Sequence, residues 1–524
     1  MTGELRMGGG STAAFVATLA GIASGCRAPS VSTEPCPQPG VARFAGVDSI
    51  ASPYDSAFAA AGAEFGVPAS LLKAIAWVET RWQMVQGAEE FPGREPAFGV
   101  MALRGAALER GAELAGVPLE RARRDPVSNI RAAAALLDAY ATETRVDRSR
   151  PEQWGTLAAR FSGIELPEGR TAYTREVYRA LGPRAGPSAA AAPASCPKPP
   201  PVFGGAPDYS PAVWRASPNF NQRPADSTGV THVVIIHTCE SNYTSCWSWL
   251  LNPASQVSAH YLVSEDGGEI SQLVLERDRA WHIAALYDCA LNHEHDCWLE
   301  GVQSNDFTVG IEHAGFASQD SFPTSQLQAS AALVCDVTRD RGIPRDWQHI
   351  LAHGQLQPRN RIDPGPHWPW VAYVHQVQAR CGEVVVDDSA QFNDPAFAVA
   401  AIPAAWPATA ATPDYYGGGY RWAATLPDAT DGAVFSFRLD AAGPRAVDAR
   451  WTSGANRSPR AAYAVIGAAG DTLAIVRQDQ TTGGGRWHAL GTWAFPAGWS
   501  RVVLLRRDVA GPMVVADAVR VRQQ

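Results

Sequence analysis

The sequence predicts a multidomain chain: an all-α domain, then a mixed α/β domain, then an all-β sandwich. Its 524 residues are too many for a single hydrophobic core. The apolar pattern also changes twice. Ala-rich helical periodicity gives way to alternating strand-like and helical runs, and these give way to short segments punctuated by Gly and aromatic residues. We therefore expect domains over residues 46–182, 209–386 and 387–524.

The composition is that of a globular protein, with 46% hydrophobic and 18% charged residues. The formal net charge is −8, and the chain has no dense tract of Lys and Arg. A protein that binds nucleic acid usually carries a basic patch for the phosphates. The charge pattern therefore argues against nucleic acid as a partner.

The N-terminal residues 1–26 resemble a signal peptide with a lipobox-like end. The weakly apolar stretch from Gly8 to Ala23 is too short to span a membrane and fits a secretory signal. Ser24 and Gly25 precede Cys26, so we expect a lipid on Cys26 and a place in the periplasm or cell envelope. An ordinary signal peptide with a chance cysteine is the alternative.

Two segments have the composition of linkers. Residues 27–45 are rich in Pro and Ser at their start and are expected to be a tether, whereas residues 183–208 carry Ala and Pro runs and are expected to form a stiff spacer.

The nine cysteines suit an oxidising compartment, because eight remain for disulfides if Cys26 carries a lipid. A zinc–thiolate cluster is the competing interpretation, but no CxxC pair occurs. We expect two close local pairs and assign the remaining four cysteines to two more: Cys239–Cys246, Cys289–Cys297, Cys335–Cys381 and Cys36–Cys196.

The first domain is expected to place a carboxylate at the end of an amphipathic helix. Leu71, Leu72, Ile75 and Val78 share one helical face, and Glu79 follows them. The region resembles the lysozyme-like domain of lytic transglycosylases through FGVP at 65–68, ET at 79–80, AFGVM at 97–101, DP at 125–126 and NIRA at 129–132. The resemblance implies that Glu79 is a general acid/base for glycan cleavage, chemistry that needs a carboxyl group kept protonated by a partly apolar pocket.

Two departures from that family leave the alternative of a glycan-binding or purely structural domain open. The family's Gln after Met is Ala102 here, and its Tyr-Asn-x-Gly motif is replaced by RFSG at 160–163. Those polar groups help to hold the sugar beside the acid.

The middle domain is organised around a short run of β-branched residues at 233–236, which predicts a strand buried on both faces. His237 lies at its exit. About 120 residues later, within the size of one domain, come His353 and then Asp363. Two imidazoles and one carboxylate, with a fourth position for water, form the ligand set of a hydrolytic zinc site.

This domain resembles the type 2 N-acetylmuramoyl-L-alanine amidases, whose fold is shared by peptidoglycan recognition proteins and phage T7 lysozyme. The similarity covers residues 219–382 and includes VSAHY at 257–261, RAWH at 279–282, VGIE at 309–312 and DPG at 363–365. It implies Zn²⁺ bound by His237, His353 and Asp363. It also implies hydrolysis of the amide between N-acetylmuramic acid and L-alanine in peptidoglycan.

The resemblance further implies roles for four other residues. Glu312 is the expected general base and acid, and Arg361, where the family often has Lys, is expected to stabilise the oxyanion. His282 and His260 are expected to be substrate-binding residues. His282 matches a substrate contact of the family, and His260 is expected to pack or hydrogen-bond near the site rather than bind zinc. A peptidoglycan-recognition protein without activity is one alternative, although such homologues typically lose the ligand that Asp363 retains. A bifunctional enzyme, in which Glu79 also cleaves glycan, is the other.

The last region shows the alternation of a β-sandwich, for example at Phe435, Phe437 and Leu439. It resembles the golvesin and xanthan-lyase C-terminal domain through ARWT at 449–452, NRS at 456–458, WHALGT at 487–492 and ADAV at 516–519. That resemblance implies attachment to carbohydrate or to the cell surface. We expect Trp451 to be a core residue, and we regard four other tryptophans as candidates for stacking on sugars: Trp422, Trp487, Trp493 and Trp499.

Overall fold

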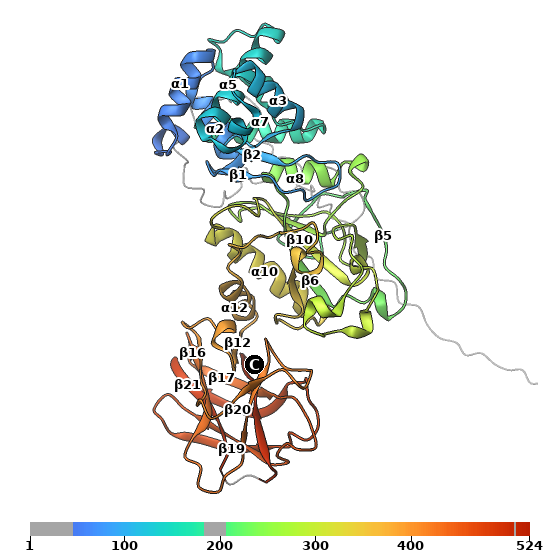
Figure 1. Ribbon diagram of the computed structural model, residues 1–524, viewed down its shortest axis with the longest axis vertical. Helices are drawn as coiled ribbons and strands as arrows, with labels where there is room; N and C mark the ends of the chain where they lie inside the picture. Colours follow the sequence, from blue (N-terminus) through green and yellow to red (C-terminus); the bar gives the residue numbers. More distant parts are fainter. Residues whose placement is uncertain (1–45, 183–205, 508–509, 524) are drawn as a thin grey trace, which may run out of the picture.

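The structure is a computed structural model that describes residues 46–182, 206–507 and 510–523. Three bodies are stacked along its long axis, with the helical region at one end, a mixed sheet in the middle and antiparallel sheets at the other end (Figure 1). A multidomain chain of these three structural classes is thus confirmed, and the residue boundaries stay predictions. The signal peptide with Cys26, the tether, the Cys36–Cys196 pair and most of the linker lie outside the described residues.

The first domain is a set of helices around one core, in which the large side chains Phe58, Trp154 and Tyr173 are buried. Its second helix ends one residue after Glu79, as the apolar spacing predicts. The helices are α1 (Asp55–Phe65), α2 (Ala69–Thr80), α3 (Gly105–Leu114), α4 (Leu119–Arg124), α5 (Pro126–Thr144), α6 (Trp154–Phe161) and α7 (Pro167–Leu181).

The expectation of an all-α first domain misses a small antiparallel sheet. Its strands are β1 (Val85–Gln86), β2 (Ala97–Gly99) and β3 (Leu103–Arg104), in the order β1-β2-β3. Strands of two or three residues are too short to produce a detectable alternation of apolar and polar side chains. The sheet lies at the side of the first domain that faces the second domain (Figure 1). The segment 87–96, which joins β1 to β2, is called the β1–β2 loop below.

The second domain contains a six-stranded mixed sheet in the order β11-β6-β10-β7-β8-β4. The expected strand beginning near residue 233 is β6, and β6, β10 and β11 run parallel to one another. The strands of this domain are β4 (Val213–Trp214), β5 (Phe220–Gln222), β6 (Val233–Thr238), β7 (Tyr261–Val263), β8 (Ile270–Gln272), β9 (Asp278–Ala280), β10 (Thr308–His313) and β11 (Ile350–Ala352).

Strand β6 is buried on both faces, as its continuous apolar run predicts. Val234 and Ile236 belong to the core beneath α10 and α12, whereas Val233 and Ile235 pack on the opposite side with Phe307. Because side chains alternate along a strand, His237 points to the same side as Ile235, away from α10 and α12. The helices of this domain are α8 (Tyr243–Leu250), α9 (Ser304–Phe307), α10 (Thr324–Arg341), α11 (His353–Leu356) and α12 (Trp370–Arg380).

The third domain is all-β within the described residues, and its larger sheets have the orders β12-β23-β17-β20 and β13-β16-β21-β18-β19. Both contribute to one core that includes Phe435, Phe437 and Trp451. The strands are β12 (Glu383–Asp387), β13 (Ala398–Ala401), β14 (Ala408–Thr409), β15 (Tyr420–Ala424), β16 (Gly432–Leu439), β17 (Gly443–Arg450), β18 (Ala461–Ile466), β19 (Thr472–Gln478), β20 (His488–Phe495), β21 (Gly498–Leu505), β22 (Met513–Ala516) and β23 (Ala518–Gln523).

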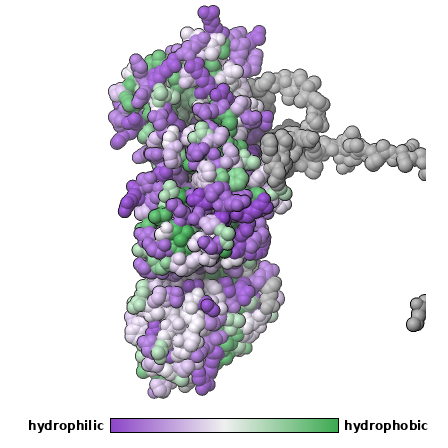
Figure 2. All heavy atoms as spheres, turned by 90° about the vertical axis from the view of Figure 1, so that its right-hand side faces the viewer, coloured by the Kyte–Doolittle hydropathy of each residue, from purple (hydrophilic) through white to green (hydrophobic). Residues whose placement is uncertain are grey.

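One face of the molecule shows how polar and apolar side chains are distributed over the first two domains (Figure 2). Hydrophilic side chains cover most of the visible face of the first two domains, and the apolar patches between them are small and separate (Figure 2). Among the described residues, none of the helices combines the length and the apolar composition needed to cross a membrane.

Three of the expected disulfides are confirmed: Cys239–Cys246, Cys289–Cys297 and Cys335–Cys381. The last of these joins α10 to the end of α12 and closes a loop with a sequence separation of 46 residues, whereas Cys289 and Cys297 are 8 residues apart. Closing a longer loop removes more conformational entropy from the unfolded chain.

We predict that replacing Cys335 and Cys381 together by Ser lowers the unfolding free energy of the second domain by ~4 kcal/mol, the chain-entropy value for this loop length. The matched variant with Ser at Cys289 and Cys297 is expected to lose only ~2.5 kcal/mol. Urea unfolding under non-reducing conditions measures both. Equal losses in the two variants would contradict an entropic origin.

Candidate functional site

Four of the candidate residues meet at one edge of the mixed sheet. His237 is in β6, and the parallel register places Glu312 of β10 directly beside it. His353 follows β11, whose Ala352 pairs with Ile236 of β6. The carboxyl ends of parallel strands therefore bring together side chains from distant parts of the sequence, the usual location of sites in open α/β sheets. Asp363 joins them from the segment after α11, and all four side chains are almost completely buried.

The protonation of His237 follows from the groups behind it. The Thr308 hydroxyl donates to the Ser304 carbonyl oxygen at 2.7 Å, so it accepts a hydrogen bond from Nε2 of His282 at 3.1 Å. A neutral His282 then has a lone pair on Nδ1, which accepts from Nε2–H of His237 at 3.0 Å. Nδ1 of His237 consequently carries no proton. Burial, with a contribution from His353, lowers the pKa of His237 to about 4, which keeps its ring neutral.

The hydrogen-bond partner of His353 likewise determines which of its ring nitrogens carries the proton. Its Nε2 lies 3.3 Å from Oε1 of Gln357, an atom that can only accept, so in the neutral ring that binds a metal Nε2 carries the proton and Nδ1 carries a lone pair. The Nδ1 atoms of His237 and His353 face each other at 3.0 Å. Oδ2 of Asp363 is 3.2 Å from each of them.

This arrangement fits a metal cation. Lone pairs of two imidazoles and an anionic carboxylate converge on one buried point, and Oδ1 of Asp363 has no hydrogen-bond partner. Without a positive charge between them these groups repel one another, whereas neutral imidazole and carboxylate are the donors that a divalent transition metal prefers. The ligand atoms lie within 4.8 Å of one another.

Glu312 lies beside the cluster with both carboxylate oxygens buried and without hydrogen-bond partners. Its Oε1 is 4.0 Å from Nδ1 of His237. Burial raises the pKa of Glu312 well above its ordinary value, and the nearby carboxylates of Glu90 and Asp363 raise it further. A carboxyl group in such surroundings takes up and releases a proton close to neutral pH more readily than an exposed one.

His282, His260 and Arg361 also lie near the cluster, and they differ in how many of their polar atoms are hydrogen-bonded. His282 is behind His237, and both of its ring nitrogens are engaged by His237 and Thr308. His260 accepts from the Gly310 N–H at 3.0 Å and lies 3.1 Å from the Asp278 carbonyl oxygen. Arg361 is buried, and its Nε has no hydrogen-bond partner.

Gly310 explains how His282 fits behind the ligand. A Cβ atom on Gly310 would lie 2.4 Å from Cγ of His282, a distance that side chains do not tolerate. The glycine therefore leaves room for the imidazole that orients His237.

One residue of the cluster was not predicted from the sequence. Glu90, in the β1–β2 loop of the first domain, places Oε1 3.1 Å from Nδ1 of His353 and 3.5 Å from Nδ1 of His237. It precedes His353 by 263 residues and lies in a loop with no recognisable motif. Only the docking of the first domain on the second brings it to the site.

Glu79 lies at the same domain boundary. Its carboxylate accepts from the Tyr173 hydroxyl at 2.6 Å and from the Asn242 side-chain amide at 2.8 Å. Burial raises its pKa, although these two hydrogen bonds oppose the shift. Asn242 belongs to the second domain, where it also caps the N-terminus of α8. Both oxygens of the Glu79 carboxylate are thus engaged, one by the first domain and one by the second.

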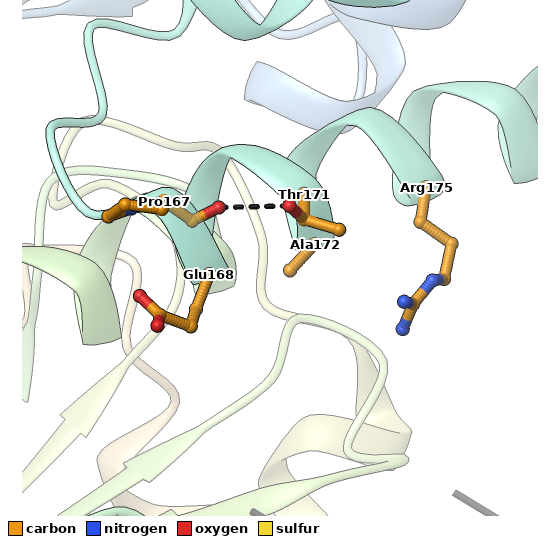
Figure 3. Close-up of a pocket in the computed structure, with 5 residues that line it drawn as sticks. All are labelled: Pro167, Glu168, Thr171, Ala172 and Arg175. Atoms are coloured by element: carbon orange, nitrogen blue, oxygen red, sulfur yellow. Dashed lines mark hydrogen bonds between the residues drawn. The ribbon is translucent and has the colours of Figure 1, made fainter.

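A separate hollow lies on α7, bounded by Pro167, Glu168, Thr171, Ala172 and Arg175 (Figure 3). The Thr171 hydroxyl donates to the Pro167 carbonyl oxygen at 2.9 Å. The side chains of Glu168 and Arg175 extend from one side of the helix. None of these residues belongs to the metal-ligand cluster or contacts Glu79, so the hollow is not a candidate catalytic site.

The tryptophans of the third domain differ in exposure. Trp451 is in the core, as expected, and stacks on His488 with ring centroids 4.1 Å apart. Trp422 and Trp493 pack partly against the same core, and Trp487 packs against Tyr416. Trp499 is 42% exposed, which makes it the most accessible of the four candidates.

Three families match consecutive regions of the chain. The transglycosylase SLT domain matches residues 56–159, N-acetylmuramoyl-L-alanine amidase matches residues 226–366, and the golvesin C-terminal domain matches residues 385–523. The resemblances inferred from motifs are therefore confirmed for all three regions.

Individual relatives agree with these matches. N-acetylmuramoyl-L-alanine amidase A of Achromobacter lyticus is 32% identical over 193 residues, which cover 33% of this chain and 98% of the relative. N-acetylmuramoyl-L-alanine amidase AmiD of Escherichia coli is 28% identical and covers 28% of this chain and 52% of the relative. Xanthan lyase of a Bacillus species is 28% identical and covers 42% of this chain but only 22% of the relative. On the near-complete match to the first of these relatives and the domain match over residues 226–366, the chain belongs to the N-acetylmuramoyl-L-alanine amidase family.

Proposed function

We propose that the protein is a zinc-dependent peptidoglycan hydrolase that cleaves the amide between N-acetylmuramic acid and L-alanine, with zinc held by His237, His353 and Asp363. The observation that carries the proposal is the convergence of Nδ1 of His237 and Nδ1 of His353, 3.0 Å apart, with the buried carboxylate of Asp363 3.2 Å from both. Membership of the amidase family supports the same substrate and the same metal.

The residues around the cluster have separate tasks in this proposal. A zinc ion bound there would supply a Lewis acid for the substrate carbonyl and for the attacking water. Glu312 accepts the proton of that water and delivers it to the leaving amine, because its carboxylate is close to the ligands and free of hydrogen bonds. Arg361 donates from its guanidinium to the oxygen that becomes negative.

His282 and His260 act as positioning residues rather than as substrate contacts. His282 holds the proton of His237 on Nε2, which leaves Nδ1 free for the metal. His260 binds the Gly310 N–H and so fixes the backbone of β10 two residues before Glu312. This assignment replaces the substrate contact that the resemblance implied for His282.

The proposed substrate determines where the protein acts, and two further features concern its attachment there. Peptidoglycan lies outside the cytoplasmic membrane, so we propose that the protein acts in the periplasm or cell envelope and that a lipid on Cys26 holds it there. The third domain is proposed to bind wall carbohydrate, with Trp499 as the most accessible platform for stacking on a sugar.

A second activity is supported by one observation. Glu79 is a buried carboxyl group whose pKa is raised by burial, as a glycan-cleaving acid requires. However, both of its oxygens are engaged, one of them by Asn242 of the second domain. We therefore regard the first domain as inactive on glycan while it is docked in this way.

We predict that removing the metal with a chelator abolishes amidase activity and lowers the melting temperature of the second domain selectively. The ligands come from β6, from the residue after β11 and from the segment after α11, so a bound ion ties these parts of the second domain together. An ion that binds only the folded state stabilises it by ~4 kcal/mol at a thousandfold excess over its Kd. Asp363→Ala should behave as the metal-free protein, and Trp499→Ala should retain metal. Full turnover by protein shown to be free of metal would contradict the assignment of a catalytic metal to this site.

For Glu312→Gln we expect retention of the metal and a loss of ~100- to 10,000-fold in rate, the usual effect of removing a general acid/base. Metal content by elemental analysis and hydrolysis of a soluble muramyl peptide are the two measurements. A rate close to that of the parent would show that another group transfers the proton.

We predict that the parent protein leaves glycan strands intact. Mass spectrometry of the products from purified wall should show free stem peptides but no new anhydromuramyl or reducing ends. Tyr173 of the same domain engages the carboxylate of Glu79, and the polar groups that hold the sugar in the family are absent at Ala102 and in RFSG at 160–163. Glu79→Gln should give the same products. New glycan ends that disappear in Glu79→Gln would establish a bifunctional enzyme.

A further inference from the structure

The first domain contributes a carboxylate to the metal-ligand cluster of the second. Glu90 is only 5% exposed, and its Oε1 faces Nδ1 of both His353 and His237. Its other oxygen is 3.8 Å from Nε of Arg361. One ligand atom from each of Glu90, His237, His353 and Asp363 lies within 4.8 Å of the other three, a grouping that could hold one metal ion. The Glu90 oxygen therefore occupies the position of a further ligand around a shared cation.

The β1–β2 loop is held firmly in this position. Phe91, next to Glu90, is buried in an apolar cluster with Tyr243, Trp247 and Ala314 of the second domain. Arg94 donates to the Ser241 hydroxyl at 2.7 Å and lies over the ring of Trp249. These contacts anchor the part of the loop that follows Glu90 in the sequence on the second domain.

The charges around Glu90 require compensation. Glu90, Asp363 and Glu312 bring three buried carboxyl groups to one site, and Arg361 is the cation with which Glu90 pairs among the described residues. Burying carboxylates together in their ionised form is costly unless a cation compensates their charge. Zinc takes four ligands, and a site with three protein ligands has one position left, which water or substrate fills in a catalytic centre. A fourth protein ligand closes such a site.

The same docking surface also covers Glu79. Asn242 of the second domain binds the Glu79 carboxylate, and α7 packs closely on α8. A Cβ atom on Gly169 of α7 would lie 2.1 Å from Oγ of Ser248 in α8, so the two helices approach as near as a glycine allows. Thr244 and Glu176 add a hydrogen bond of 2.5 Å across this boundary. Both acidic centres are thus sealed by one interface.

We propose that Glu90 is the fourth ligand of the metal and that the arrangement described here is a closed, latent form of the amidase, which opens when the first domain leaves the second. This inference rests on the proposed metal site at His237, His353 and Asp363. Opening withdraws Glu90 and leaves the fourth position to the substrate and to water. It also removes Asn242 from Glu79.

The chain offers a matched control for the test. Glu89 is adjacent to Glu90, has the same charge and is exposed. Full-length parent, Glu90→Gln, Glu89→Gln and Asp363→Ala are each loaded with Zn²⁺, and the rate of metal transfer to a chromophoric chelator is measured. Glu90→Gln should lose zinc ~10- to 100-fold faster than the parent, the range typical of lost support for a metal ligand. Glu89→Gln should match the parent.

A spectroscopic arm distinguishes ligation from a general loss of stability. With Co²⁺ in place of zinc, the visible absorption of Glu90→Gln should differ from that of the parent, because a carboxylate ligand is replaced. Phe91→Ala, which loosens the loop without removing the carboxylate, should show a mixture of the two spectra. Both variants should hydrolyse a soluble muramyl peptide faster than the parent.

The outcomes separate this inference from the function on which it rests. If parent and Asp363→Ala both fail to bind metal, the metal site itself is wrong. If the parent binds metal through Asp363 but Glu90→Gln equals Glu89→Gln in release rate and in Co²⁺ spectrum, the ligand role of Glu90 is overturned. Unchanged peptide hydrolysis in both Glu90→Gln and Phe91→Ala would overturn the latent form.

Discussion

The structure depends on the convergence of unprotonated imidazoles and carboxylates at the carboxyl ends of β6, β10 and β11. Nothing in the hydrophobic effect favours this arrangement, because lone pairs and negative charges are brought together away from water. A cation bound at this point would balance them. The surrounding hydrogen bonds serve this purpose: Thr308 and Gln357 direct the protons of His282 and His353 away from the cluster, so that both Nδ1 atoms remain available.

The mixed sheet supplies the rigidity that such a cluster needs. Strand β6 is packed on both faces, and the parallel register with β10 fixes His237 beside Glu312. The disulfide between Cys335 and Cys381 ties together the helices beneath the sheet, on the side opposite the ligands. Ligands are therefore carried by elements that cannot shift independently, whereas Glu90 is carried by a loop of another domain. The ligands of the second domain are therefore a permanent part of the site, whereas Glu90 can leave it together with the first domain.

The domain interface connects two buried acidic centres, the metal-ligand cluster and Glu79. A carboxylate of the first domain reaches the cluster of the second, and an amide of the second reaches the carboxylate of the first. In this reciprocal arrangement neither centre can be exposed without the other. In the proposed latent form both groups stay covered until the first domain leaves the second.

Much of the chain follows from local sequence. The apolar spacing up to Val78 predicts a helix that ends near Glu79, and the run at 233–236 predicts a strand with His237 at its exit; both were confirmed. The set of Glu312, His353 and Asp363 was predicted from motifs shared with the amidase family rather than from periodicity, because His353 follows a strand of 3 residues and Asp363 lies outside the helices and strands. By contrast, the short strands β1 to β3 have no detectable period, so the small sheet of the first domain was missed.

Sequence alone determined which residue types are available and which elements carry them. The tertiary structure decided what lies next to them. Glu90 resembles its neighbour Glu89 in every local respect, and only the docking of Phe91 and Arg94 on the second domain makes one of them buried beside His353 and leaves the other exposed. Asn242 likewise appears as a helix cap until the domains meet. A contact across 263 residues depends on the shapes of two folded surfaces, and these surfaces exist only after each domain has formed.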